Sequence, residues 1–125
     1  MRLGHLSCAA LVFFAPLSQA GLVDISWDGQ QRFQQELRVE PGSFIELCGK
    51  LSRGAKVKWR FDAGAPMNFN IHYHEGKEVR FPVKEDGSLR SGGTLDVKSE
   101  QDYCWMWSNK GATPADLRVD LDKGG

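Results

Sequence analysis

Residues 56–61 read Lys-Val-Lys-Trp-Arg-Phe, and residues 67–74 read Met-Asn-Phe-Asn-Ile-His-Tyr-His. In both stretches apolar and polar side chains alternate, which is the pattern of a β-strand with one face in the core and the other in solvent. We expect the following side chains to face inward: Val57, Trp59 and Phe61 in the first stretch, and Phe69, Ile71 and Tyr73 in the second. These two stretches set the fold class as β.

The rest of the chain after residue 20 repeats this pattern in short runs and shows no long helical period. We expect further strands at residues 35–40, 44–51, 78–83, 88–99, 103–109 and 114–121. Their expected inward side chains include Val79, Phe81 and Val83, and Leu117, Val119 and Leu121. The sequence therefore predicts an all-β, antiparallel, jelly-roll-like β-sandwich of about eight strands.

Turn residues separate these runs. We expect a loop at Asp62 to Pro66, a turn at Glu75-Gly76 and a hairpin-type turn at Asp86-Gly87. Gly92-Gly93 predicts a bulge or a break between two short strands. Residues 22–34 are compatible with an extra strand or with a short helix.

Residues 1–20 have the three parts of a cleavable signal peptide. Arg2 gives a positive start, an apolar run follows, and Ser18-Gln19-Ala20 supplies small residues before Gly21. The alternative is a buried N-terminal helix or strand. We expect export to the periplasm or full secretion, an N-terminal extension at residues 21–34, one domain at residues 35–122 and a frayed tail at residues 123–125.

The charge and hydropathy of the chain argue against nucleic acid and membrane as partners. The chain has 16 basic and 16 acidic side chains, so it lacks the basic surplus that a nucleic-acid backbone attracts. No apolar run after residue 20 approaches the ~20 residues that cross a bilayer as a helix. We expect no nucleic-acid partner and no membrane span in the mature protein.

Cys48 and Cys104 are the two cysteines that remain after the leader. In an exported protein such a pair most simply forms a disulfide, and a loop of this length would stabilise the fold by roughly 4 kcal/mol. The alternatives are a thiolate ligand to a metal ion or two free thiols.

Four segments together resemble the GOLD (Golgi dynamics) domain family. They are Glu46-Leu47-Cys48, residues 57–61 (Val-Lys-Trp-Arg-Phe), residues 68–71 (Asn-Phe-Asn-Ile) and residues 103–109 (Tyr-Cys-Trp-Met-Trp-Ser-Asn). The resemblance covers residues 37–121 and implies a β-sandwich, a binding role and, as in the cargo-receptor branch, a disulfide between Cys48 and Cys104. That branch also has a membrane-spanning helix and a cytoplasmic tail, which are not seen here, so we do not expect a cargo receptor.

His72 and His74 are the main chemical feature. Residues two apart on a strand point to the same face, so the two imidazoles can converge on one metal ion. Imidazole with methionine sulfur suits copper, and Met106 is the candidate third ligand, with Glu75, Asp62 and Met67 as other nearby donors. The alternative is that both histidines lie on a solvated face, hydrogen-bonded to their neighbours and with no ion.

Aromatic and basic residues each allow two interpretations. Trp59, Tyr103, Trp105 and Trp107 could form a stacking platform for a ligand, or they could be the core of a small domain. Lys56, Lys58 and Arg60 form a short basic stripe that reads as a solvated face. Asn109 reads as a turn or cap residue.

No catalytic set accompanies the histidines. The sequence has no nucleophile motif, no glycine-rich phosphate loop and no dinucleotide fingerprint, so we do not expect an enzyme. The leading hypothesis is an exported binding module that holds copper through His72 and His74. The alternative is a metal-free extracytoplasmic protein-interaction domain that uses its aromatic face or an edge strand.

Overall fold

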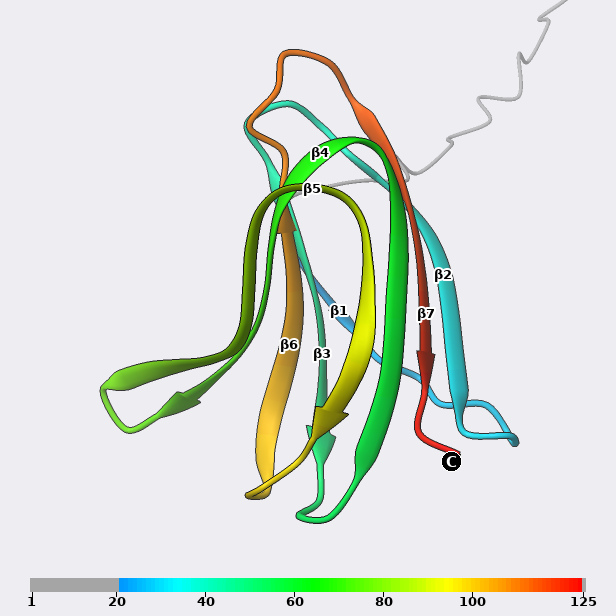
Figure 1. The fold of residues 1–125 in the computed structure, drawn as a ribbon, viewed down its shortest axis with the longest axis vertical. Coiled ribbons are helices and arrows are strands. Elements are labelled where there is room, and N and C mark those ends of the chain that lie inside the picture. Colours follow the sequence, from blue (N-terminus) through cyan, green and yellow to red (C-terminus); the bar gives the residue numbers. More distant parts are fainter. Residues whose placement is uncertain (1–20, 125) are drawn as a thin grey trace, which may run out of the picture.

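The computed structural model of the protein describes residues 21–124, which form seven strands and no helix. Figure 1 shows them as a strongly curled sheet. The strands are β1 (Gly21–Asp24), β2 (Arg32–Val39), β3 (Phe44–Leu51), β4 (Lys56–Glu75), β5 (Glu78–Asp96), β6 (Gln101–Ser108) and β7 (Ala115–Asp122). The all-β sandwich predicted from the sequence is therefore correct. Within residues 21–124 the structure has no helix that could span a bilayer.

The long strand β4 joins the two layers of the sandwich. Its first half pairs with β7, from Lys58 to Ala63, and its second half pairs with β6, from Asn68 to His72. The strand order is β1-β3-β6-β4-β7-β2, and β5 pairs with β4 along both halves. In Figure 1 the β4–β5 ribbon bends over the end of the molecule from one layer to the other. One layer is thus β1-β3-β6-β4, and the other is β2-β7-β4.

The core lies between these layers and follows the alternation of the strands. The largest fully buried side chains are Trp105, Trp107, Phe61 and Phe69. Burying each large apolar side chain contributes about 1.5–3 kcal/mol, so this set dominates the stability of the fold. The expected inward residues that are buried are Val57, Trp59, Phe61, Phe69, Ile71, Leu117, Val119 and Leu121, while Tyr73 is half-buried.

Two expected chain breaks are absent. The predicted loop from Asp62 to Pro66 is instead the bent middle of β4, where the register with β5 shifts between Asp62 and Met67. The predicted hairpin turn at Asp86-Gly87 lies inside β5, where Gly87 has a φ of 66°. Its backbone N–H donates to Asn68 Oδ1 at 3.0 Å. Both sites bend a continuing strand pair, so four of the expected eight strands merge into β4 and β5, and β1 brings the total among the described residues to seven.

The turn at Glu75-Gly76 is correct, because Gly76 and Lys77 form the two-residue connection between β4 and β5. Gly76 has a φ of 62° and begins this reversal. Gly92-Gly93 causes neither a bulge nor a break, since Trp59 pairs with Gly93 and Arg60 with Gly92 in regular register. A Cβ at Gly93 would lie 3.1 Å from Trp59 Cζ2, so this glycine makes room for the indole.

Residues 21–34 are part of the sheet and not a separate extension. They supply β1, which pairs in parallel with β3, and the first residues of β2. The sandwich is therefore antiparallel except for this one strand pair. At the other end, Lys123 is held by a hydrogen bond from its N–H to Gln31 O at 3.0 Å. The predicted signal peptide, residues 1–20, lies outside the described residues, as does Gly125.

Candidate functional site

The two histidines, the two cysteines and Met106, which the sequence identifies as candidate site residues, lie on the outer face of layer β3-β6-β4. Cys104 on β6 faces both Cys48 on β3 and His72 on β4. The residues that alternate with them, such as Trp105 and Ile71, point into the core. We call this surface the histidine face; it comprises Glu46, Asn70, His72, His74, Phe81, Met106 and the Cys48–Cys104 pair.

Cys48 and Cys104 form a disulfide, with an S–S distance of 2.08 Å. It joins directly opposed residues of the neighbouring antiparallel strands β3 and β6. The pairing is the one implied by the cysteine count and by the GOLD resemblance. In this oxidised state neither sulfur is a thiolate, so neither is free to ligate a metal ion.

His72 is buried, with 5% of its surface exposed, although it lies on the outer face of its layer. Its Nε2 is 3.1 Å from Glu46 Oε1, and its Nδ1 is 2.7 Å from Asn70 Oδ1. Burial lowers the pKa of His72 below its usual range, the Glu46 carboxylate opposes that shift, and His74 adds to it. The alternative of a solvated pair hydrogen-bonded to neighbours is therefore wrong in one respect: neighbouring side chains cover His72, whereas its contacts to Glu46 and Asn70 and the exposure of His74 agree with it.

His74 lies beside His72, as the alternation of β4 predicts. The ring centroids are 5.4 Å apart, and the rings meet edge to face at 84°. Among the described residues, however, the cluster of ligand-type atoms within 4.8 Å of one another contains Glu46, His72 and Cys104. His74 is thus a neighbour of the cluster and not a member of it.

Met106 lies on the histidine face opposite Asn70 and Glu46, two residues along β6 from Cys104. The β4–β6 pairing thus places Met106 and His72 on one face, and the role of Met106 as a metal ligand stays a prediction. The other donors considered do not join the histidine face. Met67 is in the core, Asp62 pairs with Arg90 at 3.5 Å, and Glu75 pairs with Arg80 at 3.5 Å.

Glu46 was missed as a site residue by sequence reasoning. Its carboxylate contacts His72 Nε2 from β3, across the intervening strand β6. Its position two residues before Cys48 places it on the same face as that cysteine. The sequence carries this signal, but only the strand order brings Glu46 next to a histidine.

Val79 and Phe81 were expected to face inward, and that expectation is wrong. They are 41% and 48% exposed. Val83 pairs with Ile71 and Arg80 pairs with Tyr73, so two residues of β5, Phe81 and Pro82, oppose His72 alone. This β-bulge suits a proline, which has no N–H to donate.

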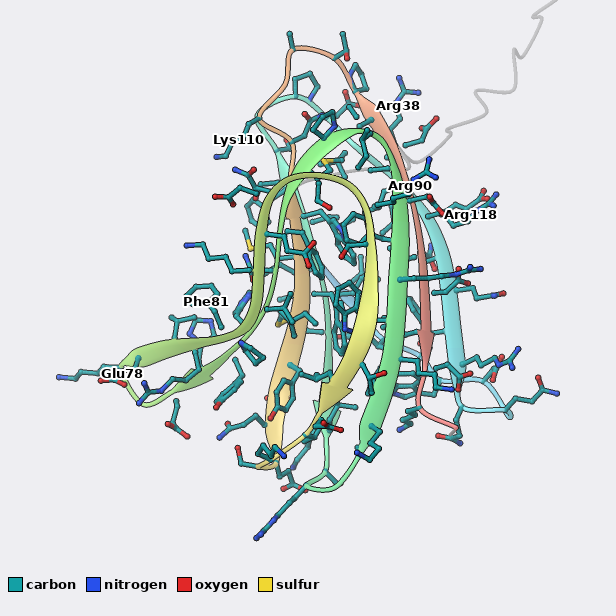
Figure 2. The ribbon with its side chains drawn as sticks, viewed as in Figure 1. Arg38, Glu78, Phe81, Arg90, Lys110 and Arg118 are labelled. Carbon is teal, nitrogen blue, oxygen red and sulfur yellow. A yellow bond between two sulfur atoms is a disulfide. The ribbon has the colours of Figure 1, made fainter. Side chains whose placement is uncertain are left out.

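The bulge leaves Phe81 on the histidine face, with its ring 5.9 Å from that of His72 and with Lys84 Nζ 5.3 Å above it. The end of the β4–β5 hairpin extends away from the two layers (Figure 1). Figure 2 places Glu78 at its tip and Phe81 beside it. We call residues 72–83 the arm.

The aromatic residues that could have formed a ligand platform are core residues. Trp59, Tyr103, Trp105 and Trp107 are all buried. Phe69 packs against Trp107 with a centroid distance of 5.3 Å, and the Tyr103 hydroxyl donates to Ser99 O at 2.9 Å. An exposed aromatic surface therefore comes from Phe81 and not from β6.

The outer face of the other layer carries charges that compensate each other. Lys56 pairs with Asp96 at 2.6 Å, and Arg60 pairs with Asp120 at 3.2 Å. Figure 2 shows Arg118 extending from the same layer, where it contacts Glu36 at 2.8 Å. Exposed pairs of this kind contribute little stability, and the basic stripe is a solvated face as predicted.

Comparison with known proteins identifies structures that share the fold of this chain. No family model matches the chain, and no curated protein matches it either. Among solved structures, PliG from Aeromonas hydrophila, a periplasmic lysozyme inhibitor of g-type lysozyme, matches with a TM-score of 0.58 at 14% identity, covering 84% of this chain and 99% of that one.

Two further structures have comparable similarity. The Yersinia pseudotuberculosis-derived mitogen has a TM-score of 0.57 at 11% identity and covers 73% of this chain and 84% of its own. PliG from Salmonella Typhimurium has a TM-score of 0.52 at 11% identity and covers 83% and 98%. These likenesses support the β-sandwich part of the GOLD resemblance, and the GOLD assignment itself stays a prediction. At such low identities they establish that this chain shares an all-β sandwich fold with these proteins.

Proposed function

We propose that this chain is an exported protein-binding module. Three observations support export: the leader-like residues 1–20, the Cys48–Cys104 disulfide, and the fold shared with proteins that are periplasmic. Disulfides persist in such oxidising compartments. Shared fold alone does not give function, so the binding role must rest on a surface of this chain.

The arm is the surface that carries the proposal. Val79 and Phe81 are large apolar side chains left exposed on a projecting hairpin. Aromatic side chains beside polar groups are typical of the residues that dominate binding at protein interfaces. Phe81 lies next to His72 and Lys84, so it can enter an apolar pocket of a partner while polar groups surround it.

The partner that we propose is a g-type lysozyme. PliG proteins from Aeromonas hydrophila and Salmonella Typhimurium are inhibitors of that enzyme class, and this fold covers 99% and 98% of those chains. In this proposal the module acts by occupying the enzyme, and its own chain performs no chemistry.

The proposal is tested by the rate at which a g-type lysozyme clears a suspension of bacterial cell walls, with and without purified residues 21–125. We expect inhibition by the native chain and at least tenfold weaker inhibition by Phe81→Ser. Leu89→Ser is the matched control, because Leu89 is also on β5 and is also 48% exposed. Full-rate clearing in the presence of the native chain would reject the partner, and equal loss in both variants would reject the arm.

A second candidate is a copper-binding module that uses His72 and His74 with Met106. The 5.4 Å separation of the two rings favours it. The ligand cluster around His72 contains Glu46 and Cys104 and not His74, which weighs against it. Calorimetry with Cu(II) would test it: the candidate requires a Kd below about 1 μM, or −8 kcal/mol, that is lost in His72→Ala/His74→Ala.

A further inference from the structure

Three potential metal ligands from three adjacent strands meet on the histidine face. They are Glu46 on β3, Cys104 on β6 and His72 on β4, and one ligand atom of each lies within 4.8 Å of the other two. Carboxylate oxygen, thiolate sulfur and imidazole nitrogen are the three ligand types that proteins use for Zn²⁺. In the oxidised chain this set is incomplete, because Cys104 Sγ is bonded to Cys48.

The spacing fits a tetrahedral ion. With bonds of about 2.0 Å to nitrogen or oxygen and about 2.3 Å to sulfur, neighbouring ligand atoms lie about 3.3–3.6 Å apart. His72 Nε2 and Glu46 Oε1 are 3.1 Å apart, close to that separation. Once free of Cys48, Cys104 Sγ would need to move by no more than about 1.3 Å, which a side-chain rotation supplies.

His72 is also oriented for this role by its second nitrogen. When Asn70 Oδ1, at 2.7 Å, accepts a hydrogen bond from Nδ1–H, the lone pair of Nε2 points at the Glu46 carboxylate. Two electron-rich atoms then face each other at 3.1 Å, an arrangement that a cation between them relieves. Metal-bound histidines commonly use their other nitrogen in this way. The site is also screened from solvent, since His72 is 5% exposed and Cys104 is 8% exposed.

We propose that opening the Cys48–Cys104 disulfide creates a site for a borderline divalent ion such as Zn²⁺, held by Cys104, His72 and Glu46. A dithiol reductant transfers two electrons and two protons to the disulfide, which becomes two thiols while the reductant becomes a disulfide. Zn²⁺ then displaces the proton of Cys104 into solvent and binds the thiolate. Cys48 stays a thiol, because its sulfur is not among the ligand atoms of the cluster, which come from Glu46, His72 and Cys104. This inference does not depend on the proposed function.

Two single substitutions separate the roles of the cysteines without any reductant. Cys48→Ala leaves Cys104 free inside the cluster, and Cys104→Ala leaves Cys48 free outside it. We expect Cys48→Ala to bind one Zn²⁺ at least tenfold more tightly than Cys104→Ala or the oxidised native chain, measured by competition with a chromophoric chelator. With Co²⁺, only Cys48→Ala should show the near-ultraviolet absorption of a cobalt–thiolate bond. Adding His72→Ala to Cys48→Ala should weaken Zn²⁺ binding at least tenfold.

Equal Zn²⁺ affinities for the two single variants would overturn the proposal, as would a cobalt–thiolate band in Cys104→Ala. Native chain treated with a phosphine reductant serves as the second route to the same site, and circular dichroism checks its β-structure. If neither Cys48→Ala nor the reduced native chain keeps that β-structure, the proposal is also overturned, because the cluster exists only in the folded sandwich.

Discussion

Asn109 shows how one polar residue can hold several chain segments together. Its side chain is fully buried and donates to Val39 O and Thr113 O, each at 2.9 Å. Its Oδ1 accepts from Gly111 N–H at 2.9 Å. The turn role predicted from the sequence agrees with the bonds to Thr113 and Gly111. The bond to Val39 could not be predicted, because it joins residues 70 positions apart.

We therefore predict that Asn109→Ala lowers the free energy of unfolding by about 2–3 kcal/mol, because buried backbone groups lose their partners. Asn68→Ala is the control, since its side-chain Oδ1 accepts an exposed hydrogen bond from Gly87 N–H, whose loss should cost at most about 1 kcal/mol. Urea unfolding of the two variants measures the difference. Equal losses would show that Asn109 does not hold these segments together.

Asp28 makes a pH-dependent contribution to the stability of the folded state. Backbone N–H groups of Arg32 and Gln30 donate to its carboxylate at 2.9 and 2.8 Å, and these bonds hold the pKa of Asp28 below its usual value of 3.8. A lowered pKa in the folded state means that the stabilisation is present above pH 3.8 and is lost as the pH falls through the folded-state pKa.

For Asp28→Asn we accordingly predict lower stability than the native chain at pH 5 and a smaller difference at pH 3. Urea unfolding at the two pH values measures both differences. Asp24→Asn, in the neighbouring strand β1, serves as the control for a simple change of charge. A difference between the native chain and Asp28→Asn that is the same at pH 5 and pH 3 would contradict the assignment.

At the scale of elements, the alternation of a strand predicts its buried face only where the strand stays regular. β3 begins and ends where the sequence predicts, and β7 keeps its expected inward set. The expectation fails for Val79 and Phe81, because the bulge at Phe81-Pro82 changes the pairing and the arm extends away from the two layers. Glycine and proline mark such irregularities in the sequence, but they do not tell a bend from a chain reversal.

Gly93 is another glycine whose structural role the sequence does not reveal, and a substitution tests that role. It lies opposite Trp59, and a Cβ there would approach Trp59 Cζ2 to 3.1 Å. We predict that Gly93→Ala lowers the free energy of unfolding by about 1–3 kcal/mol, through crowding of the indole in the core. Gly64→Ala in β4 is the control, because its Cβ would meet Asp116 N at an ordinary 3.5 Å. Thermal unfolding compares them, and a neutral Gly93→Ala would show that the indole has room to move.

At the scale of the whole molecule, strand order determines the site. The sequence predicts that His72 and His74 share a face, and it identifies the two cysteines. It does not reveal that β6 lies between β3 and β4, and this order brings Glu46, Cys104 and His72 together. Nor does it reveal that one hairpin, β4–β5, serves both layers and then extends beyond them as the arm.

The central claim is that the arm is a protein-binding surface. Its most direct test is the Kd between residues 21–125 and a g-type lysozyme, measured by calorimetry for the native chain, for Val79→Ser/Phe81→Ser and for Leu89→Ser. We predict binding by the native chain and by Leu89→Ser with similar Kd, and at least a hundredfold weaker binding by the double variant, which corresponds to about 2.7 kcal/mol. No binding by the native chain, or unchanged binding by Val79→Ser/Phe81→Ser, would contradict it.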